Sequence, residues 1–299
     1  MAYGYVFATE ILEEASYKLA DSLKYTYGLL GVVQKVRVDD RTQTAQVVVP
    51  GSITGATRTV GSAYSSAGTM PTDSAVTLQP ATEYSAPLPI DRIYSADSRL
   101  DLLREYMPLM VDNVAAQVNA ALWNLYSSVT TNSVGEATDP VSADLAHQAW
   151  TKLFNARAPM SDIYLVVGGE EMQVIKPALT WSVAGPSGEA AVIQGSVPML
   201  GGFKVVADQQ RKTSGSVAYN LALTPTSLAC AFKTRNPESP GTKLSQFTHP
   251  ETNITLFLEE RAMNESTNGV GTAFNLFCTA VVDDIYEAHA CIVTGSYNS

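Results

Sequence analysis

The spacing of apolar residues predicts one long helix at residues 97–128. Apolar side chains recur there every three or four positions, and the segment would extend about 48 Å at about 1.5 Å per residue. Pro108 is expected to kink this helix or to mark a restart within it. The stripe that we expect to be buried consists of Leu103, Met107, Met110, Val114, Val118, Leu122 and Leu125.

Residues 9–27 predict a shorter amphipathic helix near the start of the chain. Its apolar side chains follow one another at intervals of four from Ile11 to Leu23, which is the spacing of a single helix face. We expect Gly28 and Gly31 to end this helix.

Residues 32–49 alternate in a pattern typical of a β-hairpin, with VVQKVRV and AQVVV as the strands and DDRTQT as the turn. The next stretch, residues 51–74, holds fourteen Gly, Ser or Thr among its 24 residues and cannot bury a core of its own. It is either a disordered linker or a long loop that a neighbouring subunit orders. Residues 76–93 then have the pattern of an extended chain punctuated by prolines.

The second half of the chain mixes short helices with many strands. A helix at 142–158, with Ser142 or Asp144 near its start, precedes a buried-strand pattern at 162–168. A proline-rich stretch at 235–253 predicts a long connection. The remaining predicted elements are a short helix at 169–179 and strands at 203–207, 217–223, 227–232 and within 254–294. Few helices and many non-local strands indicate the α+β class.

Composition favours a protein that buries much of its surface in an assembly. Charged residues make up 16% of the 299 residues, against roughly 25% in average soluble proteins. A monomer covered with uncharged polar side chains is the alternative. The net charge of −10 and the scattered Lys and Arg argue against a sequence-specific nucleic-acid site, because such a site needs clustered positive charge.

Cysteine usage and the first residues indicate a protein made in a cytosol. Cys230, Cys278 and Cys291 are an odd number, each in an apolar strand-like run, which fits buried and reduced thiols. The start of the chain lacks the basic and apolar regions of a signal peptide. No apolar run reaches the roughly 18 residues expected of a membrane span, so no membrane association is predicted.

The sequence carries no motif typical of catalysis or metal binding. His147, His249 and His289 lie far apart, without an HExxH, zinc-type or GxSxG pattern, and we interpret each as structural. The acidic pairs, such as Glu170–Glu171, are sequence neighbours, and neighbours on a strand point to opposite faces. We therefore expect these pairs at the solvated surface, and we predict neither an enzyme nor a cofactor site.

The stretch GSVPMLGGFKVV raises the question of a phosphate-binding loop. A dinucleotide-binding loop follows a strand and opens a helix, whereas Gly195, Gly201 and Gly202 precede the strand FKVVA. We interpret Gly201 and Gly202 as a tight turn that uses positive φ before this strand.

The same stretch resembles the glycine–turn–strand phrase of tailed-bacteriophage major capsid proteins of the Hong Kong 97-type fold. The order of the other elements is similar over almost the whole chain. The resemblance implies an N-terminal arm at 1–31, an extended-loop hairpin and return strand at 32–90, a peripheral domain with the spine helix at 91–140, an axial domain at 141–235, and return strands of the peripheral domain at 236–299.

For function, the resemblance implies a subunit that assembles as pentamers and hexamers into an icosahedral shell around double-stranded phage DNA. Such a virion is built in the cytoplasm of a bacterial host and contacts its DNA without sequence specificity. The resemblance leaves open whether separate scaffolding, portal or decoration proteins take part. Some members crosslink a lysine of the extended loop to a neighbour's asparagine, but residues 51–90 contain no lysine, so no such crosslink is expected.

Two other functions are weighed against this one. The first is an encapsulin-type compartment subunit with the same fold, which encloses a cargo enzyme instead of DNA. The second is an α+β hydrolase with an unrecognised site, which would need a concave pocket holding a histidine or carboxylate of shifted pKa.

Overall fold

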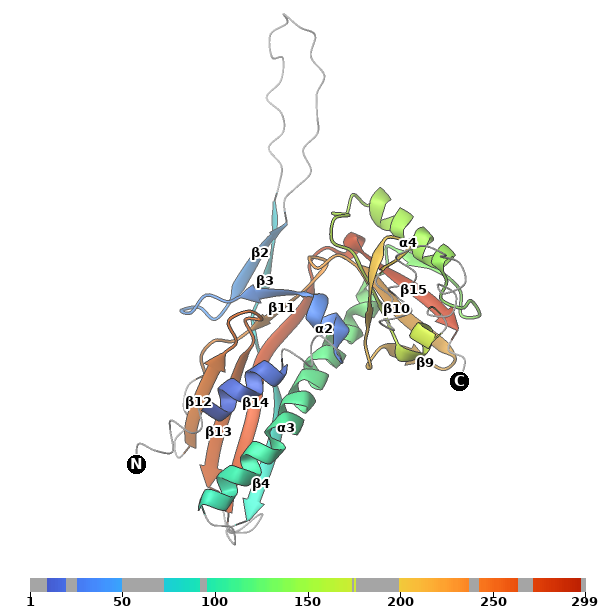
Figure 1. Ribbon diagram of the computed structural model, residues 1–299. Helices are drawn as coiled ribbons and strands as arrows, with labels where there is room; N and C mark the ends of the chain where they lie inside the picture. Colours follow the sequence, from blue (N-terminus) through green and yellow to red (C-terminus); the bar gives the residue numbers. More distant parts are fainter. Residues whose placement is uncertain are drawn as a thin grey trace, which may run out of the picture.

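The computed structural model describes residues 10–19, 26–49, 73–91, 96–173, 175, 199–236, 242–262 and 271–296. Within them, two large β-sheets lie at opposite ends of an elongated body, and the long helix α3 (Ala96–Asn124) runs along the first sheet towards the second (Figure 1). The other helical elements are residues 10–19, α2 (Gly28–Val32), η1 (Leu125–Ser128), α4 (Ala143–Asn155), residues 169–173 and η2 (Glu287–His289).

The first sheet is built around the 14-residue strand β14. This strand pairs with β4 over residues 271–280, with β13 over 272–277 and with β11 over 280–284. The strands of this sheet are β1 (Gln34–Arg37), β4 (Thr82–Asp91), β11 (Leu228–Phe232), β12 (Thr242–Thr248), β13 (Thr255–Ala262) and β14 (Gly271–Asp284). Helix α3 packs its apolar stripe on β4 and β14, so one core fills the space between helix and sheet.

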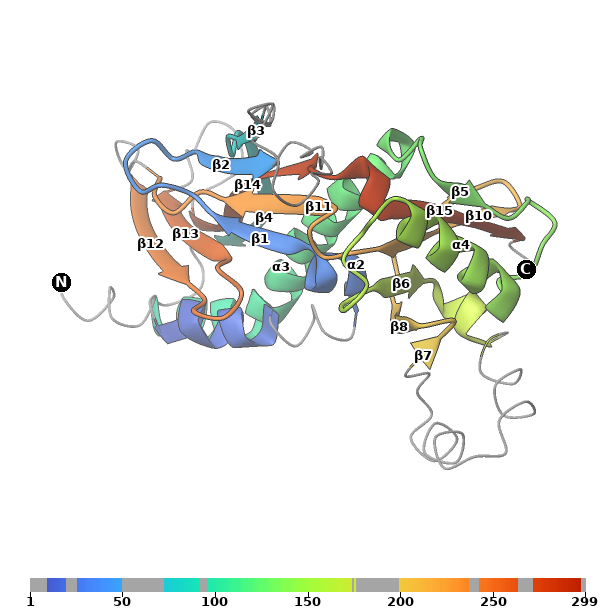
Figure 2. The same cartoon turned by 90° about the horizontal axis from the view of Figure 1, so that it is seen from above.

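The second sheet has the order β5-β15-β10-β6-β8-β7, with β9 added on β10. Its strands are β5 (Ser133–Val134), β6 (Tyr164–Val167), β7 (Met199–Leu200), β8 (Phe203–Ala207), β9 (Lys212–Ser214), β10 (Val217–Leu223) and β15 (Ala290–Ser296). Helix α4 covers one face of this sheet (Figure 2) and begins where the Ser142 hydroxyl accepts a hydrogen bond from the Leu145 amide at 3.4 Å. The sheets and helices together confirm the α+β class.

The predicted hairpin at 32–49 is wrong. Strand β1 pairs in parallel with β11, whereas β2 (Ala45–Val49) pairs with β3 (Ser74–Leu78) in a separate two-stranded sheet. The strands themselves were predicted correctly, but alternation along a strand does not identify its partner. The partner of β1 is β11 and the partner of β2 is β3, and neither follows directly in the chain. Strands β3 and β4 account for the extended pattern at 76–93. The stretch 51–72 lies outside the described residues.

Two other expectations also need correction. Gly28 begins helix α2 and Gly31 lies within it, so neither glycine ends a helix as expected. Gly28 is packed closely, because a Cβ on it would approach the carbonyl oxygen of Ala207 to 2.5 Å. The stretch at 235–253 is not only a connection, because β12 lies within it. Strand β11 (Leu228–Phe232) belongs to the first sheet, and β15 (Ala290–Ser296) belongs to the second.

Helix α3 confirms the long helix, and Pro108 lies inside it without ending it. The first helix is seen at residues 10–19, and residues 20–25 lie outside the described part of the chain. Strands β6, β8 and β10 also lie where the apolar patterns placed strands.

Candidate interaction surfaces

The turn between β7 and β8 is formed by Gly201 and Gly202, with φ angles of 56° and 91°. A Cβ atom on Gly201 would lie 2.8 Å from Cβ of Ala146, and one on Gly202 would lie 3.2 Å from Cδ1 of Trp150. The glycines therefore serve two purposes, since they adopt the left-handed conformation and let the turn pack directly on helix α4. Gly195 lies outside the described residues.

The predicted apolar stripe of α3 faces the core. Its six members within the helix are at most 5% exposed, and Leu125, which lies in η1, is half-buried against the same core. The six are Leu103, Met107, Met110, Val114, Val118 and Leu122.

A buried polar joint connects α3 to the second sheet. The carboxylate of Asp208, which follows β8, accepts hydrogen bonds from the Leu29 amide at 2.8 Å and from the Gln210 amide at 2.8 Å. The side-chain amide of Asn119 on α3 donates to both Asp208 oxygens at 3.1 Å, and its oxygen accepts from the Leu30 amide at 3.0 Å. Asp208 and Asn119 are 2% and 0% exposed. Hydrogen bonds are directional, so this joint constrains how α2, α3 and β8 meet.

The turn between β1 and β2 is tied to the chain that follows β11. The side-chain oxygen of Gln43, a residue with φ of 53°, accepts from the Thr234 amide at 3.0 Å and the Arg235 amide at 3.2 Å. The Thr234 hydroxyl donates to Asp40 at 2.9 Å. These contacts anchor the start of the β2–β3 ribbon on the first sheet.

Glu171 corrects the expectation that the paired acids are solvated. Its side chain is 5% exposed and forms an ion pair with Arg211, whose side chain is 4% exposed, while Glu170 at the surface pairs with the same guanidinium at 2.8 Å. Burial raises the pKa of the Glu171 carboxyl, against the opposing effect of Arg211. No sequence pattern marks this pair, because its members are 40 residues apart and meet only through folding.

Glu287 holds together two segments far apart in sequence. One of its carboxylate oxygens accepts four hydrogen bonds, from the amides and hydroxyls of Thr130 and Thr131, at 2.7 to 2.9 Å. These hydroxyl and amide donors lower the pKa of Glu287 to about 2. The carboxylate therefore links η2 to the chain that follows η1.

The three histidines do not come together. His147 lies on α4, His249 follows β12, and His289 lies in η2. His249 accepts hydrogen bonds from two backbone amides of its own turn, and burial lowers the pKa of His289. Within the described ranges, no group of three His, Cys, Asp or Glu side chains is arranged to hold a metal ion.

Cys230, Cys278 and Cys291 are all buried and free, and burial raises the pKa of each thiol. None of the helices in the part of the chain that the structure describes has the length and apolar character to cross a membrane.

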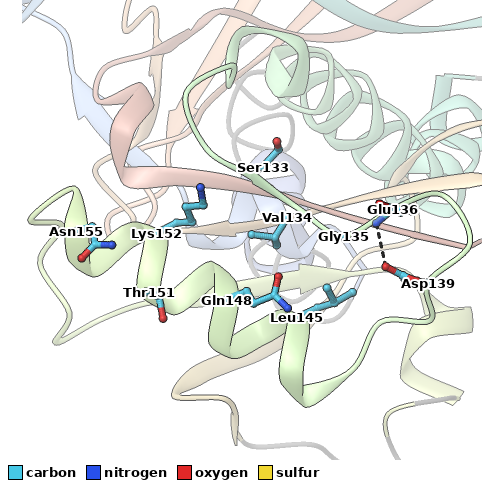
Figure 3. Close-up of a pocket in the computed structure, with 10 residues that line it drawn as sticks. All are labelled: Ser133, Val134, Gly135, Glu136, Asp139, Leu145, Gln148, Thr151, Lys152 and Asn155. Atoms are coloured by element: carbon cyan, nitrogen blue, oxygen red, sulfur yellow. Dashed lines mark hydrogen bonds between the residues drawn. The ribbon is translucent and has the colours of Figure 1, made fainter.

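An open groove of about 640 Å³ lies between strand β5 and one side of helix α4 (Figure 3). Val134 and Leu145 supply its apolar surface. One end carries a turn in which the Glu136 amide donates to Asp139 at 3.2 Å. The polar side chains that α4 contributes are Gln148, Thr151, Lys152 and Asn155.

Large apolar side chains are exposed at several places. On α4, Phe154 is 56% exposed and stacks on Trp150, with ring centroids 5.1 Å apart and 8° between the planes. Met199 on β7 is 57% exposed, and Val48 on β2 is 56% exposed. The others are Tyr17 on the first helix and Tyr106 and Leu109 on α3.

No family model matches the chain, and a search of curated proteins finds no match by sequence. Several solved structures are similar in fold to this chain over most of the length of both chains. The capsid of a native GTA particle, computed with C5 symmetry, has a TM-score of 0.59 at 13% identity and covers 91% of both chains. The capsid of cyanophage P-SCSP1u has a TM-score of 0.59 at 9% identity, over 89% of this chain and 87% of that one. Mycobacterium phage Che8 has a TM-score of 0.55 at 12% identity, over 90% of each. The chain has the Hong Kong 97-type fold of these structures.

Proposed function

We propose that this chain is a major capsid protein, which assembles as pentamers and hexamers into an icosahedral shell around the double-stranded DNA of a tailed phage. The observation that carries the proposal is the similarity of fold to phage and GTA capsid structures over about nine-tenths of the chain. The low share of charged residues supports it, because a shell subunit buries a large part of its surface against neighbours.

We assign the domains of the subunit according to the two large sheets. We assign α3 and the first sheet to the peripheral domain, with α3 as its spine helix. The second sheet, together with α4, is assigned to the axial domain, which moves β15 into the axial domain and β11 out of it. Residues 1–31 are the N-terminal arm, and the segment between β2 and β3 is the extended loop.

The β2–β3 ribbon supports contact between subunits. Neither strand contains a charged residue, and Val48 points outward with 56% of its surface exposed. Monomeric proteins usually protect edge strands with charges or prolines, so an uncharged ribbon favours pairing with another chain. In the assembled shell, a neighbouring subunit would cover it.

The proposal makes the chain a structural protein of the virion rather than an enzyme. Its net charge of −10 suits a wall that encloses DNA without binding it by sequence. Scaffolding, portal and decoration proteins are candidate partners.

Electron microscopy of the purified full-length chain tests the proposal. We expect icosahedral particles that contain only this chain as their wall. A single species near 31.9 kDa by size-exclusion chromatography, with no particles on the grid at any concentration, would refute it. Particles purified from the native source and filled with double-stranded DNA support a capsid, whereas a packaged enzyme without DNA supports the encapsulin-type alternative.

A further inference from the structure

Strand β5 is the last strand at one edge of the second sheet, and it pairs in parallel with β15. The Asn132 carbonyl accepts a hydrogen bond from the Ile292 amide of β15 at 3.0 Å. Because a trans peptide bond holds its C=O and N–H groups on opposite sides, the Ser133 amide points away from β15. In a parallel ladder the Val134 amide also faces β15, so the Ser133 carbonyl points away from it as well. Among the described residues no strand covers this side of β5, which therefore offers one donor and one acceptor to an extended chain.

The groove beside helix α4 begins at this free edge (Figure 3). Ser133 lines the groove and is exposed. The facing wall is a polar stripe of α4, in which Gln148, Lys152 and Asn155 follow one another at intervals of about one helical turn and are all exposed. An extended chain that pairs with β5 would therefore lie alongside this stripe and meet its hydrogen-bonding side chains.

The two ends of the groove carry opposite charges. Lys152 lies at the end where β5 begins, and Glu136 and Asp139 lie at the end where it finishes (Figure 3). In the part of the chain that the structure describes, none of these three side chains forms an ion pair. Unpaired charges of opposite sign at the two ends favour a ligand that carries the complementary charges in a fixed order.

We propose that this groove binds an extended segment of a partner protein, which adds to the free edge of β5 as a further strand. The segment carries a basic residue that lies against Glu136 and Asp139, and an acidic residue that lies against Lys152. Backbone hydrogen bonds to Ser133 hold the segment, whereas the charges select it, because an edge of this length supplies few backbone contacts. The inference concerns the folded subunit and does not depend on its assembly into a shell.

The direction and spacing of the two charges follow from the geometry of the groove. Antiparallel pairing is the more stable per residue, and it places the N-terminal end of the segment beside Glu136, so the basic residue comes first. The helix from Leu145 to Lys152 extends about 10 Å, a distance that three to four residues of a strand span. Side chains share a face of a strand only at even spacing, so we expect the acidic residue about four positions after the basic one.

Two synthetic peptides of identical composition test the inference. The probe is Ac-TKVTVET-NH2, and the control Ac-TEVTVKT-NH2 carries the same charges in the reverse order. In isothermal titration calorimetry with the full-length, unassembled subunit, we expect a Kd of about 100 μM for the probe and binding at least about tenfold weaker for the control. Absence of binding by the probe, or equal affinities of the two peptides, would overturn the inference.

Exchanging the charges of the groove provides an independent measurement. The variant that combines Lys152→Glu with Glu136→Lys reverses the order of the charges, so it should bind the reversed peptide more tightly than the probe. Both side chains are exposed, so circular dichroism of this variant should remain that of the wild type. A folded variant that keeps the preference of the wild type would contradict recognition by these charges.

Ser133 tests whether the segment adds as a strand. Ser133→Pro removes the amide that points away from β15, and proline is tolerated on the open side of an edge strand, so the fold should persist while binding of the probe falls at least about tenfold. Ser133→Ala is the matched control, because it keeps the amide and should bind the probe as the wild type does. Equal binding by the two folded variants would contradict the added strand.

The same titration on assembled particles distinguishes a partner protein from a second copy of this chain. A partner can use the groove only if it stays open in the shell, so the probe should bind particles as it binds the free subunit. Binding that is lost on assembly would mean that a neighbouring copy fills the groove, which would overturn the inference and leave the proposed function intact. A wild-type chain that forms no particles would refute the proposed function, whereas the titrations on the free subunit would still decide the inference.

Discussion

Asn119 provides the strongest test of how the two sheets are joined. Its side chain donates to Asp208 and Gln210, accepts from the Leu30 amide, and is completely buried. Asn119→Ala leaves the Leu30 amide without this acceptor and removes two hydrogen bonds from a buried carboxylate. Each loss costs about 1–3 kcal/mol, so we expect the free energy of unfolding to fall by at least about 3 kcal/mol.

The assay is urea unfolding of the unassembled subunit, followed by circular dichroism. Gln117→Ala is the matched control on the same helix: Gln117 also donates two hydrogen bonds, to Ser85 and Asn113, but it is partly exposed and should cost no more than about 1 kcal/mol. Hydrogen exchange at Leu29 and Leu30 gives a local measurement, since their amides should lose protection first. The reasoning fails if Asn119→Ala costs no more than Gln117→Ala and leaves that protection unchanged.

Three further predictions follow from individual contacts. Gly201→Ala should lower the thermal unfolding midpoint more than Gly215→Ala. Both glycines have positive φ, but only at Gly201 would the added Cβ lie 2.8 Å from another atom. Equal shifts of the midpoint in the two variants would contradict this prediction. Glu287→Gln should destabilise the subunit at pH 7. The folded-state pKa of Glu287 is lowered from 4.5 to about 2, so the stabilising effect of its carboxylate is full above pH 4.5 and is lost as the pH falls towards 2. The urea midpoints of the wild type and the variant should therefore converge near pH 2. A difference in midpoint that does not depend on pH would contradict this prediction. Mature particles should show no covalent ladder on a denaturing gel, because residues 51–90 contain no lysine, and a ladder in the wild-type protein would refute this prediction.

The turn at Gly201 and Gly202 shows what the local sequence can predict and what it cannot. Two adjacent glycines before a β-branched run predict a turn with positive φ, and the structure has that turn. The sequence could not indicate that the turn packs on Trp150, because this contact joins residues about 50 positions apart.

The burial of charged and polar side chains was the least predictable feature of the molecule. Glu171 stands beside Glu170 in a polar stretch and resembles any solvated acid, yet folding brings Arg211 to it and removes both from water. Asp208 and Asn119 likewise carry no local signal. A charged residue is buried only when its partners arrive from elsewhere in the chain, so its own neighbours in sequence do not reveal its burial.

The sequence by itself determined the elements of this protein and the faces that they bury. The interval at which apolar residues repeat along the chain is a local property. It was therefore enough to predict the stripe of α3, the helix α4 and most of the strands. The tertiary structure alone decided which strands pair: β1 with β11, β2 with β3, and β15 with the second sheet. Strand pairing joins backbone groups that nearly every residue carries, so a strand's own side chains select its partner only through the way in which all the elements pack together.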